Sequence, residues 1–262
     1  MTTEPPDAVP PTRVRLDLDG AVAVVTLADP GRRNALALEM TRDLARTVTE
    51  VAGRDDVSAI VVTADPPVFS AGGSLDDLLT PRAPLEEMYA GFQAIAAAPV
   101  PTIAAVGGPA IGAGVNVALA CDVIVCSPSA RFDPRFLDVG IQPGGGLLWR
   151  LRERVGRQAA AALVLCGEAL DGEQAAAIGL AWRCVPDDEL ADAARALARQ
   201  AARRPRALLA RAKQTLDETA SVTDGEAAVQ LELEPQRASM QDPVFLERLE
   251  RLRAEVRGGG DS

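Results

Sequence analysis

The sequence predicts an α/β domain with a largely parallel, buried sheet, followed by an all-helical C-terminal region. Short apolar runs alternate with amphipathic stretches at helical spacing, and the links between them are short, as in a sheet covered by helices. Around residue 165 this alternation stops, and helical spacing dominates from there onward. With 262 residues, 48% of them hydrophobic, the chain is long enough to bury a substantial core.

The N-terminal half is predicted to begin with a β-hairpin. Val14, Leu16 and Leu18 alternate with charged residues, and Asp19-Gly20 favours the tight turn of a hairpin whose second strand runs over residues 22–27. A helix with one apolar face is expected from about Ala37 to Gly53. The next expected elements are a strand at Ala59–Val62, a helix marked by Met88, Phe92 and Ile95, a strand at Ile103–Val106, a helix at Val115–Ala120, a strand at Val123–Cys126 and a helix at Leu147–Val155.

The C-terminal part is predicted to be almost entirely helical. Asp171 and Gln174 have the spacing of an N-terminal capping pair, for a helix ending near Gly179. A short strand at 181–185 and helices at about 187–203, 206–218, 224–240 and 244–256 follow. We therefore expect an α/β domain over 13–200 and a helical oligomerisation region over 201–262. Residues 1–12 lack an apolar signal core and are expected to form a disordered lead-in.

The composition excludes several classes of function. The net charge of −10 argues against nucleic acid and anionic membrane surfaces as partners. The chain has no histidine, which removes catalytic triads that use histidine and zinc sites that need imidazole. Lys213 is the only lysine, and its place in a predicted helix favours a solvated side chain over a Schiff-base role.

The four cysteines indicate the redox compartment of the protein. No CxxC pair occurs among Cys121, Cys126, Cys166 and Cys184, so they predict neither a disulfide framework nor a metal site. A reduced cytoplasmic setting fits this pattern.

The segment 94–121 has no charged residue and is long enough to span a bilayer. Its prolines and glycines instead predict a strand and a helix in a protein interior.

Two glycine-containing turns are candidates for a binding site. They lie at 69–75 and 108–114, each between a predicted strand and a predicted helix, and neither matches a dinucleotide or P-loop motif. Each turn leaves backbone N–H groups unpaired at the start of a helix. Two such groups converging on one point form an oxyanion hole, which stabilises a carbonyl oxygen as it gains negative charge. The alternative is that both are ordinary tight turns.

Four stretches of the sequence resemble motifs of one family, in the family's order and spacing. They are Asp29–Leu36 (DPGRRNAL), Phe69–Leu75 (FSAGGSL), Pro109–Asp122 (PAIGAGVNVALACD), and Ala130–Phe132 followed by Gly140–Gly146 (GIQPGGG). With them the chain is similar to the crotonase superfamily, the enoyl-CoA hydratase/isomerase family, over about residues 13–257. The resemblance implies a crotonase-like spiral of β-β-α turns whose C-terminal helices mediate homotrimers, often paired into homohexamers.

The resemblance also implies a substrate and its contacts. The substrate would be an acyl-CoA thioester, so coenzyme A would be part of the substrate and neither a separate cofactor nor a metal would be needed. The oxyanion donors would be the backbone N–H groups of Gly73 and Ala113. The residues expected to meet coenzyme A are Arg33, Asn34, Ala35, Ala71 and Gly72, with Arg32 and Arg33 supplying charge there or, alternatively, facing solvent.

The sequence departs from the family at both positions where a hydratase carries a catalytic glutamate. Asn116 and Phe136 stand at these positions. Asparagine does not titrate and phenylalanine can only pack, whereas water addition needs one proton taken and one delivered. Efficient hydration by the family's usual mechanism is therefore not expected. Other groups could replace the glutamates, and the candidates are Asp76, Asp77, Glu86, Glu87, Tyr89, Asp133 and Asp138. Asp138 is the leading candidate, and a solvated or ion-paired role is the alternative for each. Gln142 and Arg135 lie near the same site without an assigned role.

Three hypotheses follow for the function. The first is an acyl-CoA enzyme that stabilises an enolate with two backbone N–H groups. The second is a catalytically degenerate protein that binds or shuttles acyl-CoA, which the pair Asn116 and Phe136 motivates. The third, serine hydrolysis by Ser74, is disfavoured because the chain has no histidine and no GxSxG motif.

Overall fold

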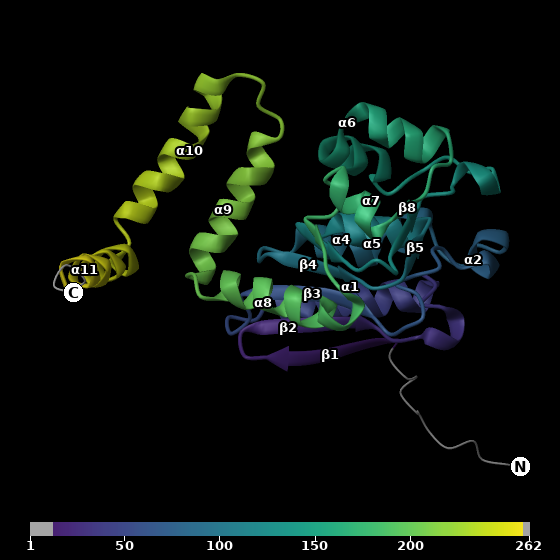
Figure 1. The fold of residues 1–262 in the computed structure, drawn as a ribbon, viewed down its shortest axis with the longest axis horizontal. Coiled ribbons are helices and arrows are strands. Elements are labelled where there is room, and N and C mark those ends of the chain that lie inside the picture. The colour runs from purple at the N-terminus through teal and green to yellow at the C-terminus, as the bar shows by residue number, and fades with distance from the viewer. Residues whose placement is uncertain (1–12, 259–262) are drawn as a thin grey trace, which may run out of the picture.

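The main sheet contains six strands, and five of them run parallel (Figure 1). The computed structural model describes residues 13–258, so the lead-in expected at 1–12 lies outside the described residues. The strand order is β1 (Val14–Asp19), β2 (Val22–Leu27), β3 (Ala59–Ala64), β4 (Thr102–Val106), β6 (Val123–Cys126) and β9 (Arg183–Cys184). β1 and β2 form the predicted antiparallel hairpin, with Gly20 in the left-handed conformation at its turn.

The two faces of this sheet are covered by different helices. Successive strand residues point to opposite faces, and the hydrophobic clusters divide accordingly. Val22 and Val24 of β2 pack in one cluster with α8 (Leu190–Ala202), whereas Ala23 and Val25 belong to the other. That second and larger cluster includes α1 (Leu38–Ala52), α4 (Ala90–Ala97) and α5 (Ala113–Ala120). The predicted α/β class, with buried strands between helices, is thus confirmed.

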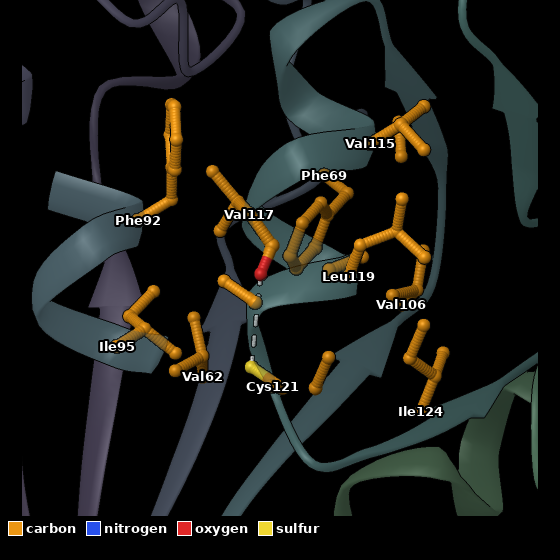
Figure 2. Packing of buried hydrophobic residues seen from close by; sticks show 14 of the residues in the cluster. Val62, Phe69, Phe92, Ile95, Val106, Val115, Val117, Leu119, Cys121 and Ile124 are labelled. Atoms are coloured by element: carbon orange, nitrogen blue, oxygen red, sulfur yellow. Dashed lines mark hydrogen bonds between the residues drawn. The ribbon is translucent and has the colours of Figure 1, made fainter. Parts of the chain in front are cut away.

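The interior between α4, α5 and the sheet is filled by apolar side chains (Figure 2). Phe92 and Ile95 of α4 lie in one cluster with Val117 of α5 and Val62 of β3. Phe92 is 1% exposed and Ile95 is 0% exposed. This packing fixes the position of α5, whose N-terminus holds one of the two candidate turns.

A second, small sheet was not predicted. It has three strands in the order β5 (Pro109–Ile111), β7 (Arg131–Asp133) and β8 (Leu170–Asp171). These strands are too short to show an alternating pattern in the sequence. Their pairing depends on segments far apart in the chain, because β5 pairs with β7 in parallel and β7 pairs with β8 antiparallel.

Several boundaries differ from the prediction for local backbone reasons. The helix expected around Met88 to Ile95 is broken at Tyr89 into α3 (Leu85–Met88) and α4. The helix expected to end at Val155 resumes after Gly156, which has φ 73° and ψ 172°, so α6 extends over Leu147–Leu165. A residue with positive φ interrupts the regular bonding of a helix, and glycine allows this without steric cost.

The capping pair and the interior segment behave as predicted. The Asp171 carboxylate accepts from the Gln174 backbone N–H at 2.8 Å, and the Gln174 side chain accepts from the Asp171 N–H at 3.0 Å, which starts α7 (Gly172–Ala177). The uncharged segment 94–121 is divided among α4, β4, β5 and α5. Within residues 13–258, no helix has the length and apolar character needed to cross a bilayer.

The last three helices lie to one side of the sheet domain in Figure 1. They are α9 (Arg206–Thr219), α10 (Gly225–Met240) and α11 (Pro243–Gly258). α9 and α10 contain no buried residue, although both carry leucine or valine on their surfaces. The predicted all-helical C-terminal region is therefore confirmed, with its apolar side chains exposed.

Lys213 joins α9 to the sheet domain, which corrects the prediction of a solvated lysine. Its side chain is only 9% exposed, and Nζ donates to Asp122 Oδ2 at 2.8 Å. The same oxygen accepts from the backbone N–H and the hydroxyl of Thr102, at the start of β4. The sequence predicted the helix of Lys213 but not its partner, since Asp122 lies far away in the chain.

Candidate active site

The two glycine-containing turns are in direct contact. The Ser70 N–H donates to the Pro109 carbonyl at 3.0 Å, and the Ile111 N–H donates to the Ser70 carbonyl at 2.9 Å, which forms a parallel bridge between the turns. A Cβ added to Gly72, which has φ 90°, would lie 2.5 Å from the Ile111 carbonyl oxygen and 3.4 Å from the Ala113 nitrogen. The absence of a side chain at Gly72 therefore lets the two turns approach each other.

The N–H groups of Gly73 and Ala113 are both left without a protein acceptor among the described residues. Gly73 faces Leu36 in a second parallel bridge, but its own N–H takes no part in the hydrogen bonds there. The Leu36 N–H donates to the Gly72 carbonyl, and the Ser74 N–H donates to the Leu36 carbonyl. Ala113 is the first residue of α5, where a backbone N–H has no partner within its helix. Both residues are partly exposed, so a ligand can approach them.

The loop predicted to meet coenzyme A lies against the first turn. The Arg33 carbonyl accepts from the Ala71 N–H at 2.9 Å, and the Ser70 hydroxyl donates to the Asn34 carbonyl at 2.8 Å. Arg33 and Asn34 both have positive φ, 54° and 50°. The loop of Arg33, Asn34 and Ala35 thus lies beside Ala71 and Gly72.

Within this loop, Asn34 has a structural role that the sequence did not reveal. Its side chain is fully buried, accepts from the Asp29 N–H at 2.9 Å and donates to the carbonyls of Asp65 at 2.8 Å and Val68 at 2.9 Å. The amide is thus occupied by backbone partners. The side chains of Arg32 and Arg33 are exposed, and neither forms an ion pair within residues 13–258. A ligand over this loop would meet these guanidinium groups and the backbone.

Asn116 is buried in the wall of the site with half of its amide unsatisfied. It is 1% exposed, and Nδ2 donates to the Gly144 carbonyl at 2.9 Å. Its Oδ1 is buried and has no hydrogen-bond partner, the only side-chain atom of this kind among the described residues. The Gly144–Gly146 segment lies directly on it, since a Cβ added to Gly145 would be 2.7 Å from Nδ2. The free part of Asn116 is therefore a hydrogen-bond acceptor.

Tyr89, at the junction of α3 and α4, approaches the same glycine segment. Its hydroxyl oxygen lies so close to Gly144 that a Cβ there would clash with it, and its ring centroid is 5.4 Å from that of Phe92. Burial raises the pKa of the Tyr89 hydroxyl, with a further contribution from Glu86. No other described residue forms a hydrogen bond with this hydroxyl, so it can form one with a ligand.

Phe136 and the nearby acids do not form an evident acid/base pair. Phe136 is half-buried and packs against the main hydrophobic cluster. Asp138 is exposed in a short 3-10 helix, Leu137–Val139. Burial tends to raise the pKa of Asp133, but ion pairs with Arg135 and Arg131 outweigh it and hold that pKa below its usual range.

Asp77, Glu87 and Ser74 have structural partners, whereas Asp76 and Glu86 are exposed to solvent. Asp77 is buried, accepts from the Leu38 N–H at 3.0 Å and pairs with Arg82 at 2.6 Å. Glu87 pairs with Arg42 at 2.6 Å. The Ser74 hydroxyl accepts from the Asp77 N–H at 3.3 Å and caps α2 (Leu75–Leu79), so it occupies a helix-capping position.

Gly144 is the site residue whose role sequence reasoning missed. Its carbonyl fixes the Asn116 amide, and its lack of a side chain admits the Tyr89 hydroxyl. The run of three glycines was visible in the sequence, but the residues that contact it come from distant segments. Close approach of a backbone to side chains is a recurrent reason for glycine, and such a run is the signal that could have indicated this contact.

Comparison with known proteins identifies the family of the chain. The family model for enoyl-CoA hydratase/isomerase matches residues 17–247. The chain is 43% identical over 248 residues to the Probable enoyl-CoA hydratase EchA14 of Mycobacterium tuberculosis (strain ATCC 25618 / H37Rv), covering 90% of this chain and 95% of the relative.

Solved structures show the same fold. An enoyl-CoA hydratase from Polaromonas sp. JS666 superposes with a TM-score of 0.86 at 27% identity, over 92% of this chain and 97% of the other. A protein from Thermobifida fusca YX, solved in complex with acetoacetyl-CoA, gives a TM-score of 0.80 at 31% identity, over 87% of this chain and 95% of the other. The chain therefore belongs to the enoyl-CoA hydratase/isomerase family of the crotonase superfamily.

Proposed function

We propose that this protein binds an acyl-CoA thioester and polarises its carbonyl with the backbone N–H groups of Gly73 and Ala113. The observation that carries the proposal is that two N–H groups from touching turns are free and partly exposed. A carbonyl oxygen that gains negative charge is stabilised strongly by fixed donors of this kind. The relative solved in complex with acetoacetyl-CoA supports a thioester as the ligand.

In this proposal coenzyme A lies over the loop beside the first turn. Arg33, Asn34 and Ala35 with Ala71 and Gly72 form its surface, and the exposed guanidinium groups of Arg32 and Arg33 suit phosphate groups. The coenzyme enters as part of the substrate, so the proposed chemistry uses no separate cofactor and no metal.

We further propose that water addition is inefficient. Asn116 has no titratable group, and Phe136 carries no polar atom. The retained chemistry is stabilisation of an enolate or a related oxyanion by the two N–H groups. A catalytically degenerate acyl-CoA-binding or shuttling protein is the second candidate, favoured by the same two residues.

The assembly and the compartment belong to the same proposal. A homotrimer or homohexamer would cover the apolar side chains of α9, α10 and α11, such as Leu216, which is 71% exposed. A reduced, cytoplasmic setting suits the four cysteines, all of which are free thiols.

Ala113→Pro tests the oxyanion assignment. Proline is well tolerated at the first position of a helix, where it removes an N–H that has no helical partner, and the preceding residue is glycine. The probe is 4-dimethylaminocinnamoyl-CoA, whose absorbance moves to longer wavelength when its carbonyl is polarised. We expect a red shift with the unaltered protein and its loss with Ala113→Pro.

Ala113→Gly is the matched control because it keeps the N–H. It should retain the red shift, and circular dichroism should show that both variants are folded. Saturable binding without any red shift in the unaltered protein would show that the carbonyl lies elsewhere, and an undiminished shift in Ala113→Pro would exclude Ala113 as a donor.

A further inference from the structure

The peptide group that carries the first proposed oxyanion donor has a glycine on each side. It joins Gly72 to Gly73, and Gly72 has φ 90°. Because glycine has no Cβ, a peptide group between two glycines meets little steric resistance when its plane rotates. The local sequence therefore does not fix the direction of the Gly73 N–H, and contacts from elsewhere in the fold must do so.

One such contact comes from the segment that leads into α1. The Leu36 N–H donates to the Gly72 carbonyl at 2.7 Å, and the Leu36 carbonyl accepts from the Ser74 N–H at 3.4 Å. The Gly72 carbonyl and the Gly73 N–H belong to one planar trans peptide group, so they point in opposite directions. The bond from Leu36 therefore directs the Gly73 N–H away from Leu36, where it has no acceptor within residues 13–258.

The segment of Leu36 is held in turn by a carboxylate of α2. Asp77 Oδ2 accepts from the Leu38 N–H at 3.0 Å, at the first residue of α1, whose N-cap residue provides no side-chain bond. The Asp77 N–H donates to the Ser74 hydroxyl at 3.3 Å. Asp77 thus joins the start of α1 to the start of α2, and these two segments flank the bond between Leu36 and Gly72.

Polar contacts, and not apolar packing, anchor α2. Asp77 is the one buried residue of this five-residue helix, whereas Leu75 and Leu79 are 69% and 83% exposed. A buried carboxylate needs hydrogen bonds or an ion pair, and Leu38 and Arg82 supply them. Hydrogen bonds to an ionised group are stronger than those between neutral groups. The position of α2 after the Gly73 turn therefore depends on this single side chain.

We propose that Asp77 is a positioning residue for the oxyanion hole. Its bond to the Leu38 N–H keeps the Gly72–Gly73 peptide group in the orientation that directs the Gly73 N–H at the ligand. This inference rests on the proposed function, because it concerns one of the two proposed donors. Asp77 acts through Leu38 and Leu36 and not by contact with the ligand. Without its bond, the peptide group can rotate and present the Gly72 carbonyl, which repels a thioester oxygen instead of polarising it.

The absorbance of bound 4-dimethylaminocinnamoyl-CoA tests this role. Asp77→Ala removes the acceptor of the Leu38 N–H, so we expect the bound thioester to lose a large part of its red shift at saturation. Unfolded protein lowers the intensity of the shifted band but not its wavelength, so the wavelength separates a misdirected donor from a loss of stability. Asp77→Asn keeps an acceptor oxygen for the Leu38 N–H and should retain most of the shift.

Asp76→Ala is the matched control, because it removes the same charge at an exposed position of α2. It should leave the band at the wavelength of the unaltered protein. Leu38→Pro removes the same hydrogen bond from the donor side and decides the matter if Asp77→Ala does not fold. Proline is well tolerated at the first position of a helix, and the preceding residue, Ala37, is already extended with ψ 164°. We expect Leu38→Pro to lose the shift as Asp77→Ala does.

The outcomes separate this inference from the proposed function. A full red shift in folded Asp77→Ala or in Leu38→Pro would overturn the positioning role and leave the proposed function intact. A red shift that Asp76→Ala reduces as much as Asp77→Ala would assign the effect to charge and would also overturn it. The absence of any red shift in the unaltered protein would overturn both.

Discussion

At the scale of single residues, the proposed site has backbone donors and no titratable side chain at positions 116 and 136. The N–H groups of Gly73 and Ala113 have no acceptor within residues 13–258, and the contact between their turns depends on Gly72. By contrast, Asn116 is fixed through the Gly144 carbonyl, and Phe136 contributes to packing. An alanine at position 113 is compatible with the proposed donor role, because that role uses a backbone atom.

We therefore expect this protein to hydrate crotonyl-CoA poorly. A positioned acid or base typically contributes 10²–10⁴-fold, so the absence of both glutamates should lower the rate by at least about 10²-fold relative to a hydratase that carries them. Loss of the conjugated thioester absorbance at high protein concentration measures the rate. Rapid hydration that Asp138→Asn abolishes would instead identify Asp138 as a replacement acid or base.

At the scale of elements, one acidic and basic cluster joins α2, α1 and the segment after α2. Asp77 in α2 accepts from the Leu38 N–H and so caps α1, whose own N-cap residue has no side-chain bond. Arg82 donates to Asp77 at 2.6 Å and to Glu39 at 2.9 Å. The cluster fixes α2 directly after the Gly73 turn.

The cluster should make stability depend on pH in the acid range. Hydrogen bonds from Arg82 lower the pKa of Glu39 to about 2 and also lower the pKa of Asp77. Carboxylates with a lowered pKa in the folded state stabilise it above their unfolded pKa, about 4, and lose this effect as the pH falls toward about 2. Arg82→Gln should therefore reduce the urea midpoint at neutral pH, and the reduction should shrink over this range.

The exposed pair of Arg251 and Glu247 on α11 provides the control, because Arg251→Gln should change the midpoint little at any pH. High salt should weaken the effect of Arg82→Gln, since these side chains are partly exposed. An effect of Arg82→Gln that is equal across the acid range would show that Arg82 acts by packing.

At the scale of the whole molecule, the C-terminal helices expose many apolar side chains in the single chain. α9 is held to the sheet domain by Lys213 and by Arg206, which donates to the carbonyls of Val57 at 2.9 Å and Ala52 at 2.6 Å. α10 and α11 continue away from the sheet domain in Figure 1. Exposed apolar patches of this kind commonly mark interfaces between subunits.

We expect light scattering to give a mass three or six times that of the chain. Leu216→Glu combined with Leu249→Glu should reduce the mass, because it places charges on side chains that are 71% and 48% exposed in the single chain. Leu18→Glu, on an exposed apolar side chain of β1, is the control and should leave the mass unchanged. A monomer at all concentrations would exclude the proposed assembly.

Long-range contacts account for the parts of the structure that the sequence did not predict. Lys213 and Asp122 are adjacent only in the folded chain, so the sequence indicated a solvated lysine where an ion pair exists. β5, β7 and β8 are too short for a periodic pattern. The acceptor character of Asn116 is decided by the Gly144 carbonyl, which no local signal connects to it.

The sequence by itself determined the α/β class, the main strands and helices, the two turns and the absence of titratable groups at positions 116 and 136. These depend on local periodicity, turn chemistry and residue identity, which are properties of neighbouring residues. Only the tertiary structure decided which N–H groups are free, how the Asn116 amide is oriented and which acids are paired. The physical reason is that hydrogen bonding and burial are set by contacts between distant segments, which exist only once the chain has folded.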